Sequence, residues 1–389
     1  MSSVLLKNIQ TIVSGDIENP VTPGDAIWVV DGLIKSSGFL SNMEIEKECD
    51  VIDCGKMTVS PGLIDSHCHV VLGDYAPRQQ QIGFMDSEVH GGVTTFISAG
   101  EVHLAGRPKD PAGTKALAIL AAKSFNNFRP GGAKVIAGAL ILEKGLTKED
   151  FQEMAREGVR VVGEIGLGSV EAPADAAPMV KWAKELGMTV MMHTGGTSIP
   201  GSSTVTAEQV IQTDPHIASH INGGPTAVAL NEVERLVKDT ELILEIVHCG
   251  NPKMAVDTVN LCIEASALNR VIIGNDAPSG TGVIPLGILR VINHLASLTP
   301  VKAEEAICMA TGNTARIYNL NRGIIAPGKE ADLVIMDAPM GSVGEDALSA
   351  ISAGDVPAVA MVLVDGQVVV GKSRNTPPPK GKVVLGRGE

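Results

Sequence analysis

Eight short apolar runs in the middle of the chain alternate with stretches of helical character. In order they are LIDSHCH, VTTFISAG, KVIAGALIL, VRVVGEIG, MTVMMHT, HIASHIN, LILEIVHCG and RVIIGNDA. Runs rich in Val, Ile and Leu are typical of strands that are buried on both faces of a parallel sheet. Eight strand–helix units predict an α/β fold with a closed (β/α)8 barrel of the TIM type. A doubly wound open sheet is the alternative, but it would not bring the first and last strands together.

Two of the helical stretches carry recognisable start signals. Thr147-Lys-Glu-Asp150 and Thr206-Ala-Glu-Gln209 fit capping boxes, in which a side-chain oxygen accepts a free N–H of the first helical turn. Gly158 and Gly187 follow helical stretches, where glycine commonly ends a helix. These signals support a strand–helix alternation in this part of the chain.

Both ends of the chain show a different, β-rich pattern. Short strand-like runs occupy VLLKNIQTIVSG, AIWVVDGLIKSSG and CDVIDCGKMTV, and a similar pattern returns in GIIAPGKEADLVIMDAP and AVAMVLVDGQVVVGK. Asp31-Gly32 supplies a hairpin turn between two of these runs. We expect residues 1–60 and 321–389 to form one small discontinuous β-sandwich domain, with residues 61–320 as the barrel domain. The Pro-rich stretch from Ser373 onward predicts a loose tail or an arm on a neighbouring subunit.

The composition suits this architecture and narrows the classes of partner. Of the 389 residues 44% are hydrophobic but only 3% are aromatic, so aliphatic side chains must fill the interior. The net charge of −13, without a Lys/Arg cluster, argues against a nucleic-acid partner. No run approaches the roughly 18 apolar residues of a membrane span, and the start of the chain does not have the pattern of a signal peptide. Six scattered cysteines without CxxC pairing fit free thiols, and we expect a cytoplasmic protein.

Side chains that bind metals stand in five of the eight runs. His67 and His69 are two apart on a strand, so they point the same way while Cys68 faces the outer helices. Glu164 lies inside an apolar strand, where a carboxylate is costly to bury unless a metal or an arginine compensates it. The other three end their strands, where each alone could be an ordinary polar residue: His193, His220 and Asp276. Together the six predict one metal centre at the mouth of the barrel.

The types of ligand constrain the metal. Four imidazoles with two carboxylates suit Zn, Fe(II), Co or Mn better than Mg or Ca. Six donors are too many for one open zinc site, which favours two divalent ions. One ion would bind His67, His69 and Asp276, the second would bind His193 and His220, and Glu164 would bridge them. Such a pair supplies hydroxide near neutral pH, and Asp276 would accept the proton of the attacking water and later donate it to a leaving nitrogen.

Longer motifs carry a resemblance to a known family. PGLIDSHCH, the later His, His and Asp positions and APGKEADLVIMD resemble the amidohydrolase superfamily over essentially the full length. Within it, the chain resembles the enamidases of anaerobic nicotinate breakdown in DYAPRQ, GRPKDPAGTKALAI, GEIGLG, HTGGTSIPGSSTVTAEQV, SHINGGPTA, GNDAPSGTG and KSRNTPPP. Many superfamily members bridge their metals with a carboxylated lysine, and Glu164 stands at that position here.

The resemblance implies a specific activity. It is the hydrolytic ring opening of 6-oxo-1,4,5,6-tetrahydronicotinate to 2-formylglutarate and ammonia. It also implies a zinc–iron pair, with two zinc ions or manganese as alternatives, and a homo-oligomer, expected to be a tetramer. Two other hypotheses remain open at this point. One is a hydrolase of another cyclic amide, imide or N-acyl substrate, and the other is a non-catalytic metal-binding barrel.

A carboxylated ring needs cationic or hydrogen-bonding anchors. Arg78 and Arg107 follow the first and second barrel strands, and a Ser/Thr/Gly-rich run that includes Thr197 and Ser203 follows the fifth. We expect these four residues to contact the substrate. The alternative is that the arginines are solvated or paired, and that the run is only a flexible loop. His248, near the end of the seventh strand, is left outside the candidate site, because a lone histidine there is more often structural or exposed than catalytic.

Overall fold

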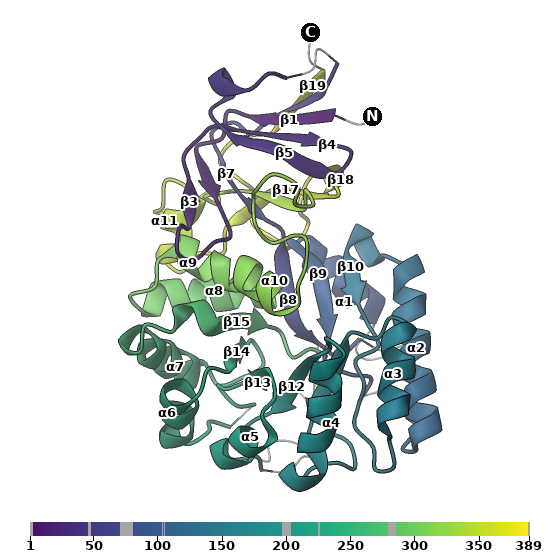
Figure 1. The fold of residues 1–389 in the computed structure, drawn as a ribbon. Coiled ribbons are helices and arrows are strands. Elements are labelled where there is room, and N and C mark those ends of the chain that lie inside the picture. The colour runs from purple at the N-terminus through teal and green to yellow at the C-terminus, as the bar shows by residue number, and fades with distance from the viewer. Residues whose placement is uncertain are drawn as a thin grey trace.

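A computed structural model gives the fold of the protein (Figure 1). It describes residues 3–45, 48–70, 81–102, 104, 106–196, 204–224, 226–278 and 285–387. A layered β-structure lies at one end of the molecule, and a barrel of strands surrounded by helices lies at the other. Within the described residues, no helix combines the length and the apolar character that crossing a membrane requires.

Strands from both ends of the chain form two sheets. The first sheet has the order β19-β6-β1-β4-β5 and the second has the order β18-β17-β16-β7-β2-β3. The strands of the first sheet are β1 (Ser3–Lys7), β4 (Ala26–Val30), β5 (Leu33–Gly38), β6 (Asp50–Asp53) and β19 (Val384–Arg387). Those of the second are β2 (Thr11–Val13), β3 (Val21–Thr22), β7 (Thr58–Pro61), β16 (Leu333–Asp337), β17 (Ala358–Val364) and β18 (Gln367–Val370). Antiparallel pairs β6–β19 and β7–β16 join the two chain ends, which confirms the predicted discontinuous β-structure. The boundaries at residues 60 and 320 stay a prediction.

Tight turns and one apolar layer hold the sheets together. Asp31 and Gly32 connect β4 to β5 with φ values of +48° and +79°. Two successive positive φ values are the geometry of a two-residue hairpin turn, so the hairpin predicted from the Asp-Gly pair is confirmed. Leu6, Val59 and Leu333 belong to one buried cluster that both sheets share.

The proline content of the C-terminal stretch predicted a loose tail, and that prediction is wrong, because the stretch contacts the rest of the chain. Ser373 Oγ donates to the carbonyl of His90 over 2.7 Å, and Asn375 Nδ2 donates to Ser87 Oγ over 2.7 Å. Strand β19 then extends the edge of the first sheet. Proline removes only its own N–H donor, so the residues that follow it remain free to pair.

Eight parallel strands form the barrel, in agreement with the predicted fold class. They are β8 (Leu63–Cys68), β9 (Val93–Ser98), β10 (Lys134–Ile136), β11 (Val161–Ile165), β12 (Thr189–His193), β13 (Ile217–Ser219), β14 (Ile243–Val247) and β15 (Val271–Gly274). Parallel bridges Leu140–Val162 and Cys68–Ala277 close the ring between β10 and β11 and between β15 and β8. The carboxyl ends of all eight strands therefore meet at one mouth, where barrels of this kind carry their functional residues.

Helices cover the outside of the barrel and the junction with the sheets (Figure 1). Thr147 and Thr206 cap α3 and α5 with complete capping boxes, as predicted. The α-helices are α1 (Gln81–Val89), α2 (Pro111–Asn127), α3 (Lys148–Arg156), α4 (Pro173–Glu185), α5 (Ala207–Thr213), α6 (Leu230–Asp239), α7 (Pro252–Glu264), α8 (Gly287–Leu298), α9 (Ala303–Cys308), α10 (Thr314–Ile317) and α11 (Ala347–Ser352). The 3-10 helices are η1 (Leu40–Asn42), η2 (Pro130–Gly132) and η3 (Leu268–Arg270), and η4 (Met309–Asn313) is a π-helix.

An irregularity near the end of β8 turns two consecutive side chains toward the barrel axis. The register between β8 and β9 shifts between Asp65 and Cys68. Ser66 Oγ and His67 Nδ1 both contact the carboxylate of Glu245, at 2.6 and 2.7 Å, although neighbours on a regular strand point to opposite faces. Cys68 packs in the apolar layer outside the strands.

Candidate metal centre

Six histidine and acidic side chains gather at the carboxyl ends of five barrel strands. The six are His67 of β8, His69 directly after β8, Glu164 of β11, His193 of β12, His220 directly after β13, and Asp276 after β15. They form two groups of three whose nitrogen and oxygen atoms lie within 4.8 Å of one another in each group, His67–His69–Asp276 and Glu164–His193–His220. The six residues that the sequence singled out thus lie together, and their role as metal ligands remains to be tested.

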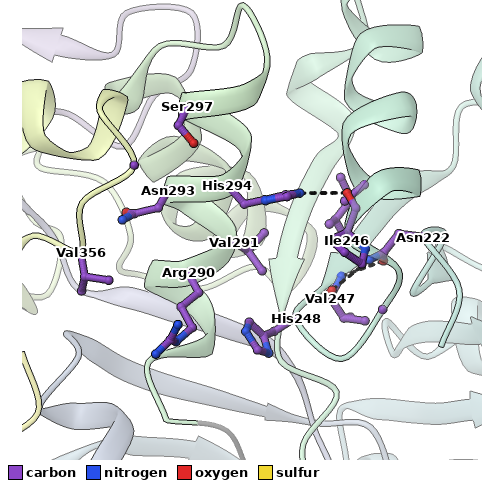
Figure 2. Close-up of a pocket in the computed structure, with 14 residues that line it drawn as sticks. Asn222, Ile246, Val247, His248, Arg290, Val291, Asn293, His294, Ser297 and Val356 are labelled. Atoms are coloured by element: carbon purple, nitrogen blue, oxygen red, sulfur yellow. Dashed lines mark hydrogen bonds between the residues drawn. The ribbon is translucent and has the colours of Figure 1, made fainter. Parts of the chain in front are cut away.

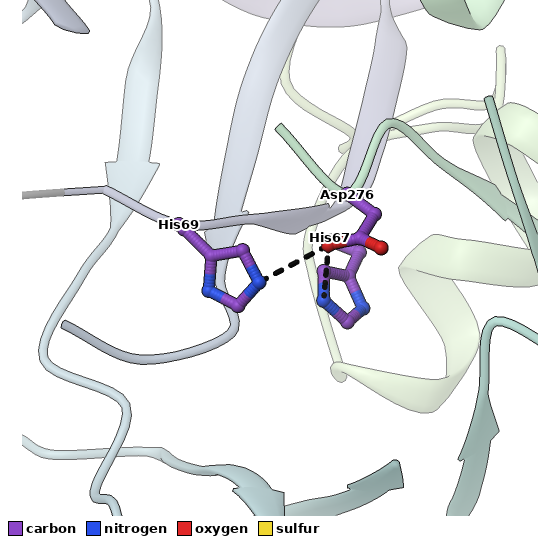
Figure 3. Close-up of side chains that lie close together, drawn as sticks. All are labelled: His67, His69 and Asp276. Carbon is purple, nitrogen blue, oxygen red and sulfur yellow. Dashed lines mark hydrogen bonds and ion pairs between the residues drawn. The ribbon is translucent and has the colours of Figure 1, made fainter. Parts of the chain in front are cut away.

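Asp276 is the centre of the first group (Figure 3). Its Oδ1 atom lies 3.1 Å from His69 Nε2 and 3.6 Å from His67 Nε2. The backbone N–H of Asp276 donates to the carbonyl of His67 over 2.9 Å, so the ends of β8 and β15 are tied beside the site. Asp276 has a φ of +54°, which is uncommon for a residue other than glycine and is often found at functional sites.

Glu164 stands between the two groups, because its two oxygens face different histidines. Oε2 lies 3.6 Å from Nε2 of both His67 and His69. Oε1 lies 3.4 Å from His193 Nδ1 and makes a short hydrogen bond with His220 Nε2. Gly163, next to Glu164, lies so close to strand β9 that a Cβ atom would come within 2.4 Å of the Ala99 carbonyl oxygen. The close approach of these strands brings the carboxylate to the centre of the site.

Burial and close contact shift the pKa values of these groups. Burial by itself raises the pKa of Glu164, but His220 and His67 outweigh it and hold that pKa well below its ordinary value. Burial lowers the pKa of His67, yet the Glu245 and Glu164 carboxylates raise it well above the usual range. Burial also lowers the pKa of His220, but the Glu164 carboxylate outweighs burial and raises that pKa above its ordinary value. The carboxylates therefore stabilise positive charge among the imidazoles, which a bound cation would also supply.

Buried atoms at this site fit metal ligation. His67 Nε2 is completely enclosed and makes no hydrogen bond with any residue that the structure describes. His69 directs its Nδ1 at the Gly100 carbonyl oxygen over 3.2 Å, so its Nε2 points at the cluster. Imidazole nitrogens and carboxylate oxygens are the donors that zinc and iron accept, and a backbone or carboxylate partner on the other nitrogen is usual for a histidine ligand. The residues present thus fit two divalent ions.

Two residues that support the site escaped the sequence reasoning. Glu245, in the middle of β14, holds His67 Nδ1, and Tyr318 donates its hydroxyl to the carbonyl of Ser66 over 3.2 Å. Glu245 could have been found, because it interrupts the apolar run LILEIV just as Glu164 interrupts VRVVGEIG. Tyr318 carries no such signal, since an aromatic residue near the end of a helix is ordinary.

A buried hydrogen-bond network also supports the strand ends from outside the barrel. Asp65 Oδ1 accepts from the backbone N–H groups of Asn275 and His67 at 2.9 and 3.1 Å, and Asp65 Oδ2 accepts from Asn275 Nδ2 at 2.9 Å. Asn275 Nδ2 also lies 3.3 Å from Glu88 of α1. Burial raises the pKa of Asp65 to about 7 and that of Glu88 to about 8. This network fixes the residues adjoining His67 and Asp276.

A further acidic group of three lies at the junction of barrel and sheets and has a different role. Glu330, Asp332 and Asp365 come together around Lys134 of β10, whose Nζ atom lies within 2.6 to 2.9 Å of all three carboxylates. An ammonium group already occupies the centre of this cluster. It is a largely buried ion-pair network that joins the barrel to the β16–β18 sheet.

The predicted substrate contacts are only partly visible. Arg78, Thr197 and Ser203 lie outside the described residues. Arg107 pairs with the buried Glu143, with 2.8 Å between Nη1 and Oε1, and its side chain is 8% exposed. Its guanidinium also lies 3.5 Å from the Leu167 carbonyl oxygen. In this structure Arg107 therefore joins three loops of the barrel mouth, and its assignment to the substrate stays a prediction.

The sequence profile of the amidohydrolase family matches residues 58–369 of the chain. The chain belongs to the amidohydrolase family. It is 59% identical to the enamidase of Eubacterium barkeri over 380 residues, which cover 98% of each protein. The imidazolonepropionase of Bacillus cytotoxicus is 24% identical and aligns with 87% of this chain and 91% of its own length.

Comparison with solved structures gives the same family. The crystal structure of an enamidase superposes with a TM-score of 0.96 at 58% sequence identity, covering 99% of this chain and 100% of that one. The agreement extends over the sheets as well as the barrel. This amidohydrolase therefore has the complete architecture of its relative.

Proposed function

We propose that this amidohydrolase opens the ring of 6-oxo-1,4,5,6-tetrahydronicotinate and releases ammonia, as the enamidase branch of the family does. The coarser part of this function follows from the family and the 59% identity: the protein is a hydrolase of carbon–nitrogen bonds in cyclic amides. The observation that carries the proposal is the Glu164 carboxylate, whose two oxygens face two separate groups of histidines.

In this proposal the two groups hold two divalent ions, a zinc–iron pair. His67, His69 and Asp276 would hold one ion, His193 and His220 would hold the other, and Glu164 would bridge them. When bound, such ions lower the pKa of a water molecule and polarise an amide carbonyl. Within the described residues, the clusters contain imidazole and carboxylate donors without a thiolate, which supports borderline metals over softer ones.

Asp276 is the residue proposed to move the proton. Its carboxylate is 15% exposed, whereas Glu164 is 2% exposed, so of the two it is the more open to the mouth. Burial raises its pKa, but the hydrogen bond from His69 and the charges of His67 and His220 lower it below the ordinary value. Asp276 is therefore ionised at neutral pH, and can accept a proton from the attacking water and donate it to the ring nitrogen as the amide bond breaks.

The overall reaction uses two water molecules. The first adds to the amide carbonyl carbon, and the ring C–N bond breaks to leave a carboxylate and an enamine. The enamine tautomerises to an imine by moving a proton from nitrogen to carbon. The second water adds to the imine carbon, and loss of ammonia leaves the aldehyde of 2-formylglutarate. No oxidant or reductant takes part.

The test measures ammonia release by the zinc- and iron-loaded enzyme. With 6-oxo-1,4,5,6-tetrahydronicotinate we expect turnover, and with dihydrouracil or N-acetylated amino acids far slower release. Chelation should abolish turnover, and readdition of metal should restore it. Preferred turnover of a dihydropyrimidine would contradict the proposed substrate. Full metal occupancy without any hydrolysis would favour the alternative of a non-catalytic metal-binding barrel.

Assembly, location and domain boundaries complete the proposal. We infer a homo-tetramer in the cytoplasm, because the resemblance to enamidase covers the whole chain. All six cysteines lie within the described residues, are buried and form no disulfide bond, which is compatible with a reducing compartment. We also propose the domain boundaries at residues 60 and 320. Sedimentation velocity of the metal-loaded protein tests the subunit number.

A further inference from the structure

A hollow borders helix α8 and the end of β14, and Figure 2 draws the residues that line it. It has a volume of about 460 Å³ and lies between α7, α8 and the segment that follows α11. None of the six proposed metal ligands lines it. Cavities of this size are typical of small-molecule sites.

Helix α8 presents a polar stripe to this hollow. Arg290, Asn293, His294 and Ser297 follow one another at the spacing that places side chains on one face of a helix. The opposite face of α8 is apolar and buried, and includes Ile288, Ile292 and Leu295. Along this stripe Arg290 is exposed, His294 and Ser297 are half-buried, and Asn293 is buried.

Asn293 is the clearest sign of a missing ligand. The residue is 5% exposed, and neither its Oδ1 nor its Nδ2 makes a hydrogen bond with a residue that the structure describes. A buried amide without partners costs about 1 to 3 kcal/mol for each group left unsatisfied. In Figure 2 its side chain points from α8 toward Val356, into the hollow. A hydrogen-bonding ligand at this place would remove that cost.

Among the described lining residues, Arg290 carries a full positive charge, against the net charge of −13 of the whole chain. Arg290, His248 and His294 line the hollow, and no aspartate or glutamate is among the described lining residues. Asp355, the acid between lining residues Gly354 and Val356, accepts a hydrogen bond from Ser342 Oγ over 2.6 Å. Among the described residues, the Arg290 guanidinium has no ion-pair or hydrogen-bond partner.

His248 lines the same hollow. Its Nδ1 atom is buried without a hydrogen bond to a described residue. Burial, and then the charges of Arg290 and His294, lower the pKa of His248 to about 4. The imidazole is therefore neutral at pH 7 and available to donate or accept one hydrogen bond.

We propose that this hollow binds a small organic carboxylate, with its anionic oxygens on the Arg290 guanidinium and the Asn293 amide. An arginine fork matches the geometry of a carboxylate, and a neighbouring amide N–H adds a second donor. Ile246, Val291 and Val356 form apolar walls that suit the carbon skeleton of such a ligand. The proposal does not rest on the proposed hydrolytic function, and none of the six proposed metal ligands lines the hollow.

Succinate and its neutral analogue succinamide are the probes, because they share a skeleton and differ in charge. Isothermal titration calorimetry with the metal-loaded protein at low ionic strength should detect binding of succinate and no binding of succinamide. R290Q should weaken binding at this site by about tenfold or more, since about 1.4 kcal/mol corresponds to tenfold. R235Q is the matched control, because Arg235 is a surface residue of α6 that pairs with Glu208 over 2.7 Å.

N293L provides a second test that does not depend on charge. It should lose succinate binding without a lower melting temperature, because it removes an amide that lacks partners in the ligand-free fold. Both variants should keep the wild-type rate of hydrolysis. Wild-type affinity for succinate in R290Q and N293L would place binding elsewhere and overturn the proposal, as would the absence of binding to the unmodified protein. Dissociation of the assembly by either variant would identify the hollow as a subunit interface and also overturn it.

Discussion

Glu245 Oε2 lies 2.7 Å from His67 Nδ1, and both side chains are completely buried. The carboxylate accepts a hydrogen bond from Nδ1 and a second from Ser66 Oγ. It thus fixes the imidazole so that Nε2 faces Glu164 and Asp276. Carboxylates that hold a histidine ligand in this way raise its basicity and orient its ring.

We expect Glu245→Gln to weaken metal binding and turnover by about ten- to a hundredfold, because the amide cannot support the imidazole with a full negative charge. Metal content after dialysis against a graded chelator gives the affinity. Glu143→Gln is the control, since Glu143 is equally buried but contacts Arg107 rather than a proposed ligand. Unchanged metal affinity in Glu245→Gln would show that the contact does not support ligation.

Asp276→Asn should reduce turnover by at least about a hundredfold, because asparagine cannot accept the proton that the carboxylate takes from water. The Glu164, His193 and His220 group is untouched, so its metal should be retained. Ammonia release and elemental analysis on the same sample measure both effects. Asp239→Asn, at an exposed position at the end of α6, serves as the control. Substantial activity in Asp276→Asn would assign the proton transfer to another group.

Cys68→Ser should leave the metal content unchanged, although the thiol stands between two proposed ligands. Cys68 packs in the apolar layer outside the barrel, on the side away from His67 and His69. Burying a hydroxyl there should cost about 1 to 3 kcal/mol of stability. Elemental analysis measures the metal content, and thermal unfolding measures the stability. A loss of metal at unchanged stability would contradict the strand geometry.

Lys134→Met should destabilise the fold by about 3 kcal/mol, because it removes the ammonium that three carboxylates share and leaves the buried Asp332 with the more distant Arg322, at 3.7 Å. This is the lower end of the range for a buried pair, since Glu330 and Asp365 are partly exposed. Urea unfolding measures the change. Lys123→Met removes the exposed pair with Glu157 and should cost less than about 1 kcal/mol. Equal effects of the two substitutions would rule out a special role for the Lys134 network.

His216 predicts part of the pH dependence of stability. Its Nδ1 accepts the backbone N–H of Val190 over 3.0 Å, which only the unprotonated nitrogen can do. Burial, and then Lys184, lower its pKa below the ordinary value of 6.5. The contribution of neutral His216 to the free energy of unfolding is therefore present above pH 6.5, and it is lost as the pH falls through the lower folded-state pKa.

The change His216→Asn keeps an acceptor near that position but removes the titration. Between pH 7.5 and 5, the unmodified protein should lose more stability in urea than this variant loses. Parallel curves for the two proteins would show that His216 does not contribute to the pH dependence.

The local pattern determined much of this protein. The eight strands, the capping residues Thr147 and Thr206, and the turn at Asp31-Gly32 depend on neighbours within a few positions, so the sequence predicts them directly. The pairing of His67 with His69 follows from the alternation of a strand. The six proposed ligands could be selected because each interrupts or ends an apolar run.

Tertiary structure alone decided which distant groups meet. Glu245 contacts a histidine 178 positions away, Arg107 turns to Glu143, and Lys134 gathers three carboxylates from the far end of the chain. A charged side chain in an apolar run indicates that a group of opposite charge must lie beside it in the folded protein. The sequence does not show which residue supplies that group. Closure of the barrel fixes the partner, because it determines which strand ends come within hydrogen-bonding distance of one another.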